Sequence, residues 1–269
     1  MIKLVVSDID GTLLPYGQQS LDPSVFDVIG ELRARGVLFC PASGRQYHSV
    51  RRLFAALGDD LLWLCENGAI LYGSGPEAQA PILHRTTLPR ETALELCREI
   101  LNLPGCQILI SGANVSYLCG CTPDYVDYIG NQKGNRVSVC SDPAEIKEDI
   151  LKVSAYCPDG TAAYRKKLAP KWSERLNVAT AGPDWLDFTV ANKGTGLLEL
   201  CRVLGIGPEE TLAFGDNWND VGMLDRAGLA FIMDSADPAL LERYANHCAS
   251  VPDVLRTEMD RWFPVEKVQ

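Results

Sequence analysis

Short apolar runs alternate with amphipathic segments in the first third of the chain. Three apolar runs predict buried strands, at residues 2–6, 37–40 and 61–65. Two segments between them predict helices, at residues 22–35 and 45–57. Asp22 followed by Pro23 is typical of a helix start, because the aspartate caps the first turn and proline suits the first helical position. This alternation predicts a parallel sheet with helices on both faces.

The middle of the chain has a different pattern. A Gly-Ser-Gly-Pro segment at residues 73–76 indicates a linker. After it, a hairpin is predicted around residues 112–114 and a strand over residues 151–156. Helices are predicted at residues 89–101, 123–130, 143–149 and 161–172. We therefore expect an α+β insert, which we place at residues 78–187.

Strand–helix alternation returns in the last third. Strands are predicted at residues 185–190, 211–214 and 229–233, and helices at residues 194–204, 219–226 and 251–262. The two ends of the chain therefore predict one core domain, built from residues 1–77 and 188–269. The expected fold is α/β: a doubly wound, Rossmann-like parallel-sheet core interrupted by the α+β insert, which forms a cap domain.

Composition and charge narrow the class of protein. The 269 residues are 46% hydrophobic and 22% charged, as is typical of a globular protein. The net charge of −10 argues against a nucleic-acid partner, whose phosphates such a surface repels. No apolar stretch approaches the roughly 18 residues that a membrane span needs, and the start lacks a signal-peptide pattern. We expect a cytoplasmic protein with no membrane partner.

Ten cysteines are scattered along the chain without a Cys-x-x-Cys pair. Most lie in apolar runs, so we expect reduced core residues. Cys119 and Cys121 are close in sequence, but no further ligand lies nearby to indicate a metal site.

Two carboxylates, Asp8 and Asp10, follow the first predicted strand in the segment Asp-Ile-Asp-Gly-Thr. A spacing of two places both side chains on one side of an extended strand, where they can share a metal ion or a substrate. In open α/β sheets this carboxyl edge is where ligands bind. A turn or helix cap would explain Asp10 but leaves Asp8 without a role.

Polar residues also follow other predicted strands. Ser43 and the backbone N–H groups beside it stand at a helix start, which favours anion binding, although Ser43 could serve only as a helix cap. Lys193 also opens a predicted helix, where the helix dipole disfavours a cation, so we expect an anionic partner for it. The segment 215–220, Gly-Asp-Asn-Trp-Asn-Asp, adds two carboxylates and two amides.

These segments, in this order, resemble the four motifs of the haloacid dehalogenase-like phosphohydrolases, and within them the Cof-type sugar phosphatases. The motifs are Asp8–Thr12, Ser43–Arg45, Lys193–Gly194 and Gly215–Asp220. The likeness covers nearly the whole chain, including the Cys-Glu-Asn-Gly-Ala segment at 65–69 and a large cap between the second and third motifs.

The resemblance implies a Mg2+-dependent phosphatase that hydrolyses a small phosphorylated metabolite, preferentially a sugar phosphate, through an aspartyl-phosphate intermediate. Asp8 is the implied nucleophile, and Asp10 the implied general acid and then base. Mg2+ is implied at Asp8, at the backbone carbonyl of Asp10 and at Asp216. An acid at position 10 is typical of phosphatases and phosphomutases rather than of members that use ATP to drive motion.

The resemblance also implies contacts to phosphate and substrate. The expected residues are Ser43, Gly44, Arg45, Asn67, Lys193 and Asn219. Asp220 is expected to orient Lys193 or a metal-bound water.

Two other functions compete with this hypothesis. A phosphomannomutase-like enzyme uses the same aspartyl-phosphate but needs basic residues at the mouth of the cap; the insert holds 12 basic and 13 acidic residues, which does not favour it. A metabolite-binding protein with an inactive site is the third possibility, but every catalytic residue is present. The sequence implies no obligate protein partner.

Overall fold

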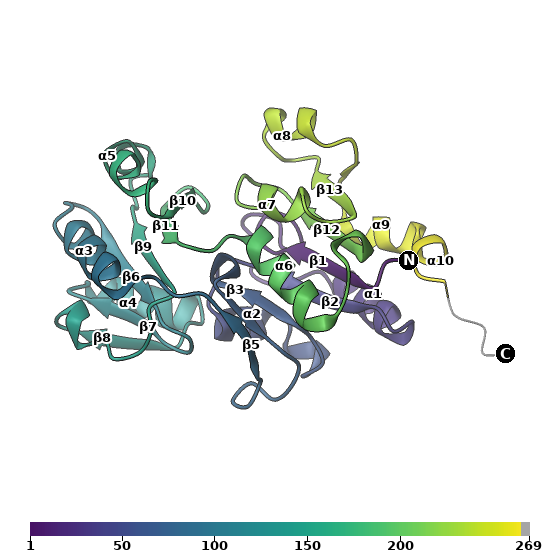
Figure 1. The fold of residues 1–269 in the computed structure, drawn as a ribbon, viewed down its shortest axis with the longest axis horizontal. Coiled ribbons are helices and arrows are strands. Elements are labelled where there is room, and N and C mark those ends of the chain that lie inside the picture. Colours follow the sequence, from purple (N-terminus) through teal and green to yellow (C-terminus); the bar gives the residue numbers. More distant parts are fainter. Residues whose placement is uncertain (265–269) are drawn as a thin grey trace.

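The computed structural model describes residues 1–264 and contains two sheets (Figure 1). The larger has eight strands in the order β14-β13-β12-β1-β2-β3-β4-β5, and the smaller has six in the order β10-β11-β9-β6-β7-β8. The smaller sheet, with helices α3 and α5, lies at the end of the molecule opposite α9 and α10. Segments from both ends of the chain build the larger sheet.

The larger sheet, here called the core sheet, is parallel from β14 to β3, and β4 and β5 extend it as antiparallel strands. Its strands are β1 (Leu4–Asp8), β2 (Leu38–Ala42), β3 (Trp63–Cys65), β4 (Ile70–Tyr72), β5 (Ile82–Arg85), β12 (Thr211–Gly215), β13 (Leu229–Met233) and β14 (His247–Cys248).

Helices cover both faces of the core sheet. They are α1 (Pro23–Ala34), α2 (Tyr47–Leu53), α6 (Lys193–Leu204), α7 (Val221–Leu224), α8 (Pro238–Arg243), α9 (Val251–Thr257) and α10 (Met259–Trp262). Side chains of β1 alternate between the faces: Leu4 and Val6 pack in the cluster that includes α6 and α7, and Val5 packs in the cluster that includes α1 and α9. Because both faces are covered, the strand is a continuous apolar run.

The smaller sheet, here called the cap sheet, is mostly antiparallel. Its strands are β6 (Gln107–Ser111), β7 (Ser116–Cys119), β8 (Val137–Cys140), β9 (Lys152–Tyr156), β10 (Asn177–Thr180) and β11 (Trp185–Thr189). The helices of this region are α3 (Arg90–Leu101), α4 (Pro123–Asp127) and α5 (Ala162–Trp172). One face packs against α3 and α5 through apolar residues such as Ile110, Val153 and Phe188.

The expected fold class is confirmed: a doubly wound α/β core carries an inserted α+β region. The hairpin around residues 112–114 is present as β6 and β7. Asp22 caps α1 as expected, because its side chain accepts a hydrogen bond from the backbone N–H of Ser24. The C-terminal helix, expected as one piece, is divided into α9 and α10.

Two strands lie in a different sheet from the one their position in the sequence suggested. The division at 78–187 places β5 in the insert, but β5 pairs with β4 in the core sheet, and Leu83 packs toward the α6 cluster. The strand expected to resume the core, β11, pairs instead with β9 and β10 in the cap sheet. The place beside β1 in the core sheet is taken by β12. Lys193 therefore follows β11, a strand of the smaller sheet, rather than a strand of the core sheet.

The helix expected over residues 143–149 is wrong. Only Pro143–Glu145 forms a single 3-10 turn, and Ile146 is already extended. Ile146 and Ile150 bury their side chains in the cap core separately, and Arg90 of α3 donates a hydrogen bond to the Ile146 carbonyl at 2.8 Å. These tertiary contacts outweigh the local helical pattern.

The expectation that the cysteines are reduced is wrong for two of the ten. Cys119 of β7 lies opposite Cys140 of β8 in the sheet register, their Cα atoms are 4.7 Å apart, and they form a disulfide. Cys121, which is close to Cys119 in sequence, is free. The register of β7 and β8 brings these two cysteines together although they are 21 residues apart in the sequence.

Across residues 1–264, no helix is both long enough and apolar enough to cross a membrane.

Candidate active site

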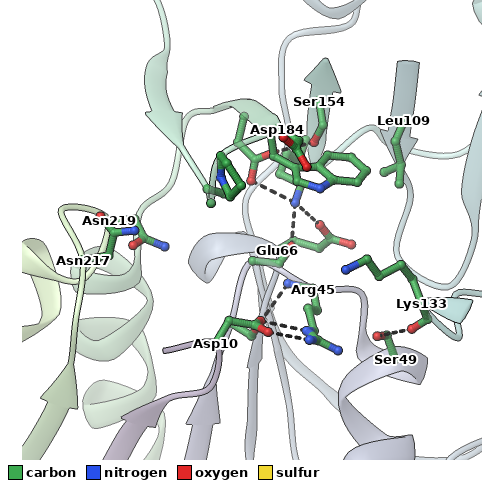
Figure 2. Close-up of a pocket in the computed structure, with 18 of the residues that line it drawn as sticks. Asp10, Arg45, Ser49, Glu66, Leu109, Lys133, Ser154, Asp184, Asn217 and Asn219 are labelled. Carbon is green, nitrogen blue, oxygen red and sulfur yellow. Dashed lines mark hydrogen bonds and ion pairs between the residues drawn. The ribbon is translucent and has the colours of Figure 1, made fainter. Parts of the chain in front are cut away.

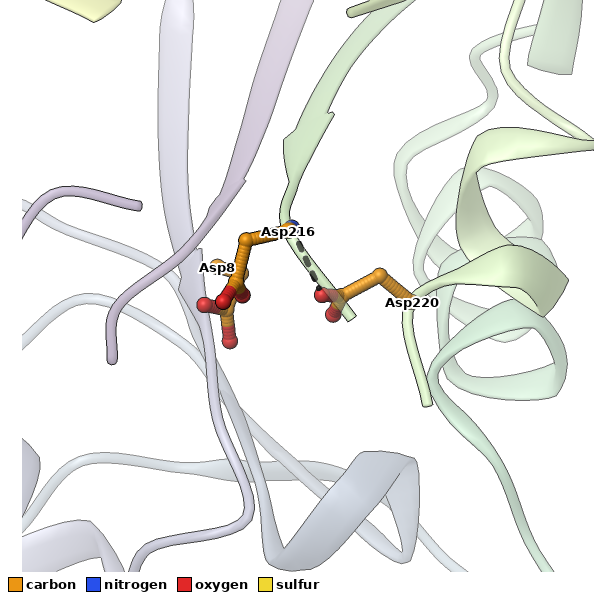
Figure 3. A group of neighbouring side chains, drawn as sticks. All are labelled: Asp8, Asp216 and Asp220. Carbon is orange, nitrogen blue, oxygen red and sulfur yellow. Dashed lines mark hydrogen bonds between the residues drawn. The ribbon is translucent and has the colours of Figure 1, made fainter. Parts of the chain in front are cut away.

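The carboxyl ends of β1 and β12 bring three aspartates together. The two strands are parallel neighbours with Ser7 opposite Phe214, so Asp8 and Asp216 follow at one edge of the core sheet. Carboxylate oxygens of Asp8, Asp216 and Asp220 lie within 4.8 Å of one another (Figure 3). All three side chains are buried. The sheet topology therefore concentrates negative charge at one point.

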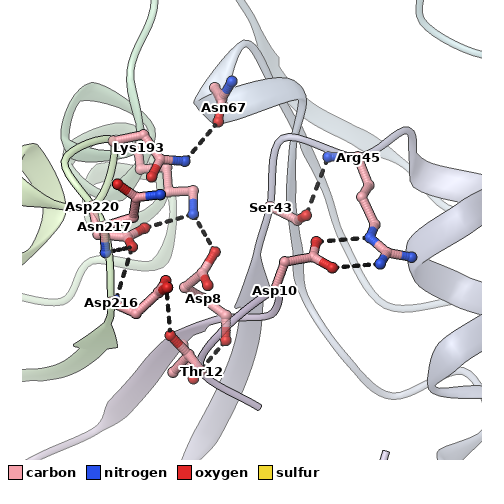
Figure 4. A network of polar contacts seen from close by, with 12 residues as sticks. Asp8, Asp10, Thr12, Ser43, Arg45, Asn67, Lys193, Asp216, Asn217 and Asp220 are labelled. Carbon is pink, nitrogen blue, oxygen red and sulfur yellow. Dashed lines mark hydrogen bonds and ion pairs between the residues drawn. The ribbon is translucent and has the colours of Figure 1, made fainter. Parts of the chain in front are cut away.

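Lys193 supplies the positive charge in this cluster (Figure 4). It begins α6, is 1% exposed, and its Nζ contacts Asp8 Oδ1 and, at 2.6 Å, Asp220 Oδ1. Burial lowers the pKa of Lys193, but the two carboxylates outweigh burial and raise that pKa above its ordinary value. Lys193 thus has the anionic partners that its place at a helix start required.

Asp220 holds the loop that carries Asp216. Its second oxygen, Oδ2, accepts hydrogen bonds from the backbone N–H groups of Asp216 at 3.1 Å and Asn217 at 3.0 Å. One carboxylate therefore fixes both the loop after β12 and the ammonium of Lys193. The two contacts leave Asp220 with little freedom to move.

The acidic cluster has the properties of a divalent-cation site. Asp8 Oδ2 is buried and has no hydrogen-bond partner among the described residues. Burial and the neighbouring Asp220 charge raise the pKa of Asp8 well above its ordinary value, and the same two causes raise the pKa of Asp216 to about 6. Three carboxylates facing one ammonium leave an excess of negative charge. Oxygen ligands of this kind suit Mg2+.

Gly11 allows the first motif to approach Asp216. Its φ is +95°, a conformation that L side chains rarely adopt, and a Cβ here would lie 2.1 Å from Asp216 Oδ2. Glycine is therefore required at this position both by the backbone and by the neighbouring carboxylate.

Asp10 points away from this cluster toward Arg45 (Figure 4). Arg45 Nε donates to Asp10 Oδ2 at 2.8 Å, and Nη2 contacts Asp10 Oδ1, so the pair is bidentate. Ser43 Oγ accepts the backbone N–H of Arg45 at 3.1 Å. The first two motifs are thus joined through their side chains.

Asn67 joins the core motifs to the cap. Its Nδ2 donates to Asp187 Oδ2 at 2.7 Å, and its Oδ1 accepts from Asn219 Nδ2 at 3.4 Å. The backbone N–H of Asn67 donates to the Ser43 carbonyl at 3.0 Å. A Cβ on Gly44 would lie 3.0 Å from Asn67 Oδ1, so a residue without a side chain lets the two loops touch.

A cavity of about 340 Å³ opens above these residues, between the core and cap sheets (Figure 2). Seven of the residues expected from sequence line it: Asp8, Asp10, Ser43, Gly44, Arg45, Asp216 and Asn219. Lys193, Asp220 and Asn67 are buried beside them and reach them through the contacts above. The structure therefore brings together all ten residues that the sequence selected.

Sequence reasoning missed a second buried lysine, which comes from the cap. Lys152 of β9 contacts Glu66 Oε2 at 2.9 Å, Asp187 Oδ2 at 3.2 Å and the Gly44 carbonyl at 2.6 Å. Ser154 Oγ donates to Asp187 Oδ1 at 2.6 Å. The sequence contained an indication of this contact, because Lys152 and Asp187 are each the single charged residue of a predicted strand.

Sequence reasoning also missed two hydroxyl groups at Asp216. Tyr16 OH donates to Asp216 Oδ2 at 2.9 Å, and Thr12 Oγ1 donates to Oδ1 at 3.4 Å. Burial and the Asp216 charge raise the pKa of Tyr16 above its ordinary value. Thr12 belongs to the first motif, whereas nothing in the sequence pattern singled out Tyr16.

A parallel core sheet with an acidic carboxyl edge, covered by an inserted cap, defines a class of α/β enzyme built to handle an anionic substrate. A family model described as haloacid dehalogenase-like hydrolase matches residues 5–253. The chain belongs to the haloacid dehalogenase-like hydrolase family, and it is an enzyme.

Known relatives agree with this family. The 5-amino-6-(5-phospho-D-ribitylamino)uracil phosphatase of Escherichia coli (strain K12) is 23% identical over 243 residues, which cover 89% of this chain and 88% of the relative. A crystal structure from Eubacterium rectale has a TM-score of 0.81 and 27% identity, covering 95% of this chain and 98% of that one. A haloacid dehalogenase subclass IIB sugar phosphatase has a TM-score of 0.77 at 19% identity, over 95% and 98% of the two chains, and this likeness shows the fold.

Proposed function

We propose that this enzyme is a Mg2+-dependent phosphatase that hydrolyses a small phosphorylated metabolite, preferentially a sugar phosphate. The observation that carries the proposal is the buried, unpartnered oxygen of Asp8 beside Lys193 and two further carboxylates. This arrangement supplies a nucleophile and the means to hold a phosphoryl group.

Asp8 is the proposed nucleophile. One carboxylate oxygen forms a bond to phosphorus while the bond from phosphorus to the leaving oxygen breaks, giving an aspartyl-phosphate. Water then attacks that phosphorus, inorganic phosphate leaves, and the Asp8 carboxylate is regenerated. Lys193 holds the Asp8 carboxylate in place through both steps.

Asp10 is the proposed general acid and base. It gives a proton to the leaving alkoxide and takes one from the attacking water. In the structure Arg45 holds both oxygens of Asp10. Asp10 must therefore leave Arg45 before it can transfer a proton, and a substrate that draws Arg45 away would free it.

The remaining core residues bind the phosphoryl oxygens. Ser43 and Asn219 line the cavity and supply hydrogen-bond donors there, Lys193 supplies an ammonium buried beside Asp8, and Gly44 lets its loop lie against Asn67. Asp220 keeps Lys193 and the Asp216 loop in position. Arg45, which lines the cavity, and Asn67, which is buried beside it, are the further proposed substrate contacts.

Asp8, Asp216 and the backbone carbonyl of Asp10 are the proposed Mg2+ ligands. The metal neutralises phosphate charge, so that a carboxylate can approach an anion. The unpartnered oxygen of Asp8 and the raised pKa of Asp216 support a cation at this place.

The relatives support a phosphorylated polyol as substrate. The Escherichia coli relative is named for a substrate with a phosphorylated ribityl chain, and a solved structure of the same fold is a sugar phosphatase. We also propose that the inserted region is a separate cap domain that closes over the cavity, and that the enzyme works in the cytoplasm.

The test is phosphate release from sugar phosphates, nucleotides and p-nitrophenyl phosphate, with Mg2+ and with EDTA. Wild type is compared with Asp8→Asn and with Asp234→Asn, an exposed aspartate outside the cavity. Release that needs Mg2+, is lost in Asp8→Asn and persists in Asp234→Asn supports the proposal. Activity that survives in Asp8→Asn contradicts the nucleophile. No release, with bisphosphate-activated isomerisation instead, would indicate the mutase.

A further inference from the structure

One residue that lines the cavity has a buried oxygen without a partner. Glu66 follows β3, is 2% exposed and lines the cavity (Figure 2). Its Oε2 accepts hydrogen bonds from Ser111 Oγ at 3.0 Å and contacts Lys152 at 2.9 Å, but its Oε1 has no hydrogen-bond partner among the described residues. A buried carboxylate oxygen without a donor is costly, so this position favours a donor brought by a ligand.

Backbone hydrogen bonds join Glu66 to the loop of residues 43–45. Its N–H donates to the Arg45 carbonyl at 3.2 Å, and the next N–H, of Asn67, donates to the Ser43 carbonyl. Glu66 and Asn67 both have positive φ, 51° and 56°, the two non-glycine residues in residues 1–264 that do. The turn keeps this strained conformation because cap and core contacts hold both side chains.

Lys152 and Ser154, the donors beside Asp187 in this network, are already engaged and do not reach the free oxygen. Lys152 Nζ already reaches Glu66 Oε2, Asp187 and the Gly44 carbonyl, so its three donors are used. Ser154 donates to Asp187. Glu66 Oε1 is therefore the acceptor in this network that is left for a ligand.

The charge of the network selects the kind of ligand group. Glu66 and Asp187 both contact a single ammonium, that of Lys152, so the Glu66 carboxylate presents negative charge to a ligand group at this place; Lys133 lines the same cavity but forms no ion pair with Glu66 among the described residues. A hydroxyl group can donate to Glu66 Oε1. A carboxylate or a second phosphate at the same place would be repelled and would leave the oxygen unpaired.

We propose that Glu66 determines specificity for the leaving group: Oε1 accepts a hydrogen bond from a hydroxyl of a phosphorylated sugar or sugar alcohol and disfavours leaving groups that carry an anion. This proposal rests on the proposed phosphatase function. It concerns the alcohol that departs, whereas Asp8 and the metal site concern the phosphoryl group that is transferred.

Glu66→Gln tests the proposal because it replaces the free acceptor, Oε1, with an amide NH2 group, which is a donor. Ser111 and Lys152 are donors, so they retain the amide oxygen, and the amide NH2 then faces the cavity in place of Oε1. The measurement is kcat/KM for D-ribose 5-phosphate, 3-phosphoglycerate and p-nitrophenyl phosphate. We expect the ratio of ribose 5-phosphate to 3-phosphoglycerate to fall about tenfold or more. A shift toward the anionic substrate cannot come from partial unfolding.

Ser111→Ala is the matched control, because it removes a partner of Glu66 Oε2 and does not line the cavity. We expect its substrate ratio to stay within about twofold of wild type. An unchanged ratio in Glu66→Gln overturns the proposal, and so does an equal shift in Ser111→Ala, which would point to general loosening of the network.

A measurement on wild type covers the case in which Glu66→Gln does not fold. Deoxy analogues of ribose 5-phosphate and glucose 6-phosphate, each lacking one hydroxyl, are compared with their parents. Loss of about tenfold in kcat/KM for at least one analogue supports the proposal, and losses below twofold for all of them overturn it. If wild type hydrolyses none of the esters with Mg2+, the proposed phosphatase function itself fails. If wild type hydrolyses p-nitrophenyl phosphate but does not distinguish the deoxy analogues from their parents, only the proposed role of Glu66 is overturned.

Discussion

Two buried lysines, one in each part of the molecule, have similar surroundings but different consequences. Lys193 lies between Asp8 and Asp220 in the core, and Lys152 lies between Glu66 and Asp187 at the cap. In both cases burial lowers the lysine pKa and the paired carboxylates raise it above the ordinary value. The shared arrangement shows that a buried ammonium between two carboxylates does not by itself define a catalytic centre.

The difference lies in what surrounds each pair. Both clusters have a carboxylate oxygen without a partner among the described residues, Asp8 Oδ2 and Glu66 Oε1, but only the core pair has a third carboxylate, Asp216, so it has the capacity to hold a cation. The cap pair has no third carboxylate within the described cluster; instead it contacts the Gly44 carbonyl and so ties the two sheets together. We infer that the first lysine serves chemistry and the second serves the position of the loops.

The largest effect expected is on stability, in Lys152→Met. The substitution leaves Glu66 and Asp187 buried without a counter-charge, which costs about 3–5 kcal/mol. Urea unfolding measures it. Lys171→Met is the control, because Lys171 is a half-exposed cap lysine between Glu95 and Glu99, and its loss should change stability far less. Equal losses in the two variants would contradict the structural role of the cap pair.

The next effect is on turnover, in Lys193→Met. Removing the ammonium that holds Asp8 should lower kcat for p-nitrophenyl phosphate by roughly 10²–10³, as loss of one charged contact to the transition state does. Lys152→Met, measured where it is folded, should lower kcat far less. If both variants lose kcat equally, the division between chemistry and positioning is wrong.

Metal binding should distinguish the two clusters as well. The proposed Mg2+ would relieve the repulsion among the three aspartates, and at a hundred times its Kd it should stabilise the protein by about 2.7 kcal/mol. Thermal unfolding with Mg2+ and with EDTA measures this. Asp216→Asn should abolish the stabilisation and Asp187→Asn should retain it; retention in Asp216→Asn would place the metal elsewhere.

The smallest stability effect is expected in Arg45→Gln. Its ion pair with Asp10 is partly exposed, so loss of the pair should change stability by less than about 1 kcal/mol. Urea unfolding gives this value, and steady-state kinetics show whether KM rises, as expected for a rim contact to substrate. A large loss of stability with unchanged KM would make Arg45 a structural residue.

The core fold was largely predictable because patterns of neighbouring residues in the sequence indicate its strands and helices. Apolar runs mark the buried strands, and the carboxyl ends of parallel strands must meet at one edge of the sheet, so the pattern alone places Asp8 near Asp216. The cap was harder, since its pairings are long-range. Strand β11 follows the insert in sequence yet pairs with β9, and no local signal distinguishes that sheet from the core.

The cap contribution to the site escaped prediction for a related reason. Lys152, Ser154 and Asp187 become neighbours only through the antiparallel register of β9 and β11. A single charge in an apolar strand signals a buried partner, but one sequence does not say which partner. The disulfide of Cys119 depended in the same way on the register of β7 and β8.

The alternation of side chains across the cap strands has a consequence for the two faces of the cap sheet. Odd and even positions of β6, β9 and β11 serve separate tasks: Leu109, Ser154 and Asp187 line the cavity, while Ile108, Val153 and Phe188 pack against the helices behind. The cap sheet thus separates the side chains that form the cavity wall from those that hold the sheet to its helices. Asp187 is the exception, because it forms part of the cavity wall and is also the buried partner of Lys152.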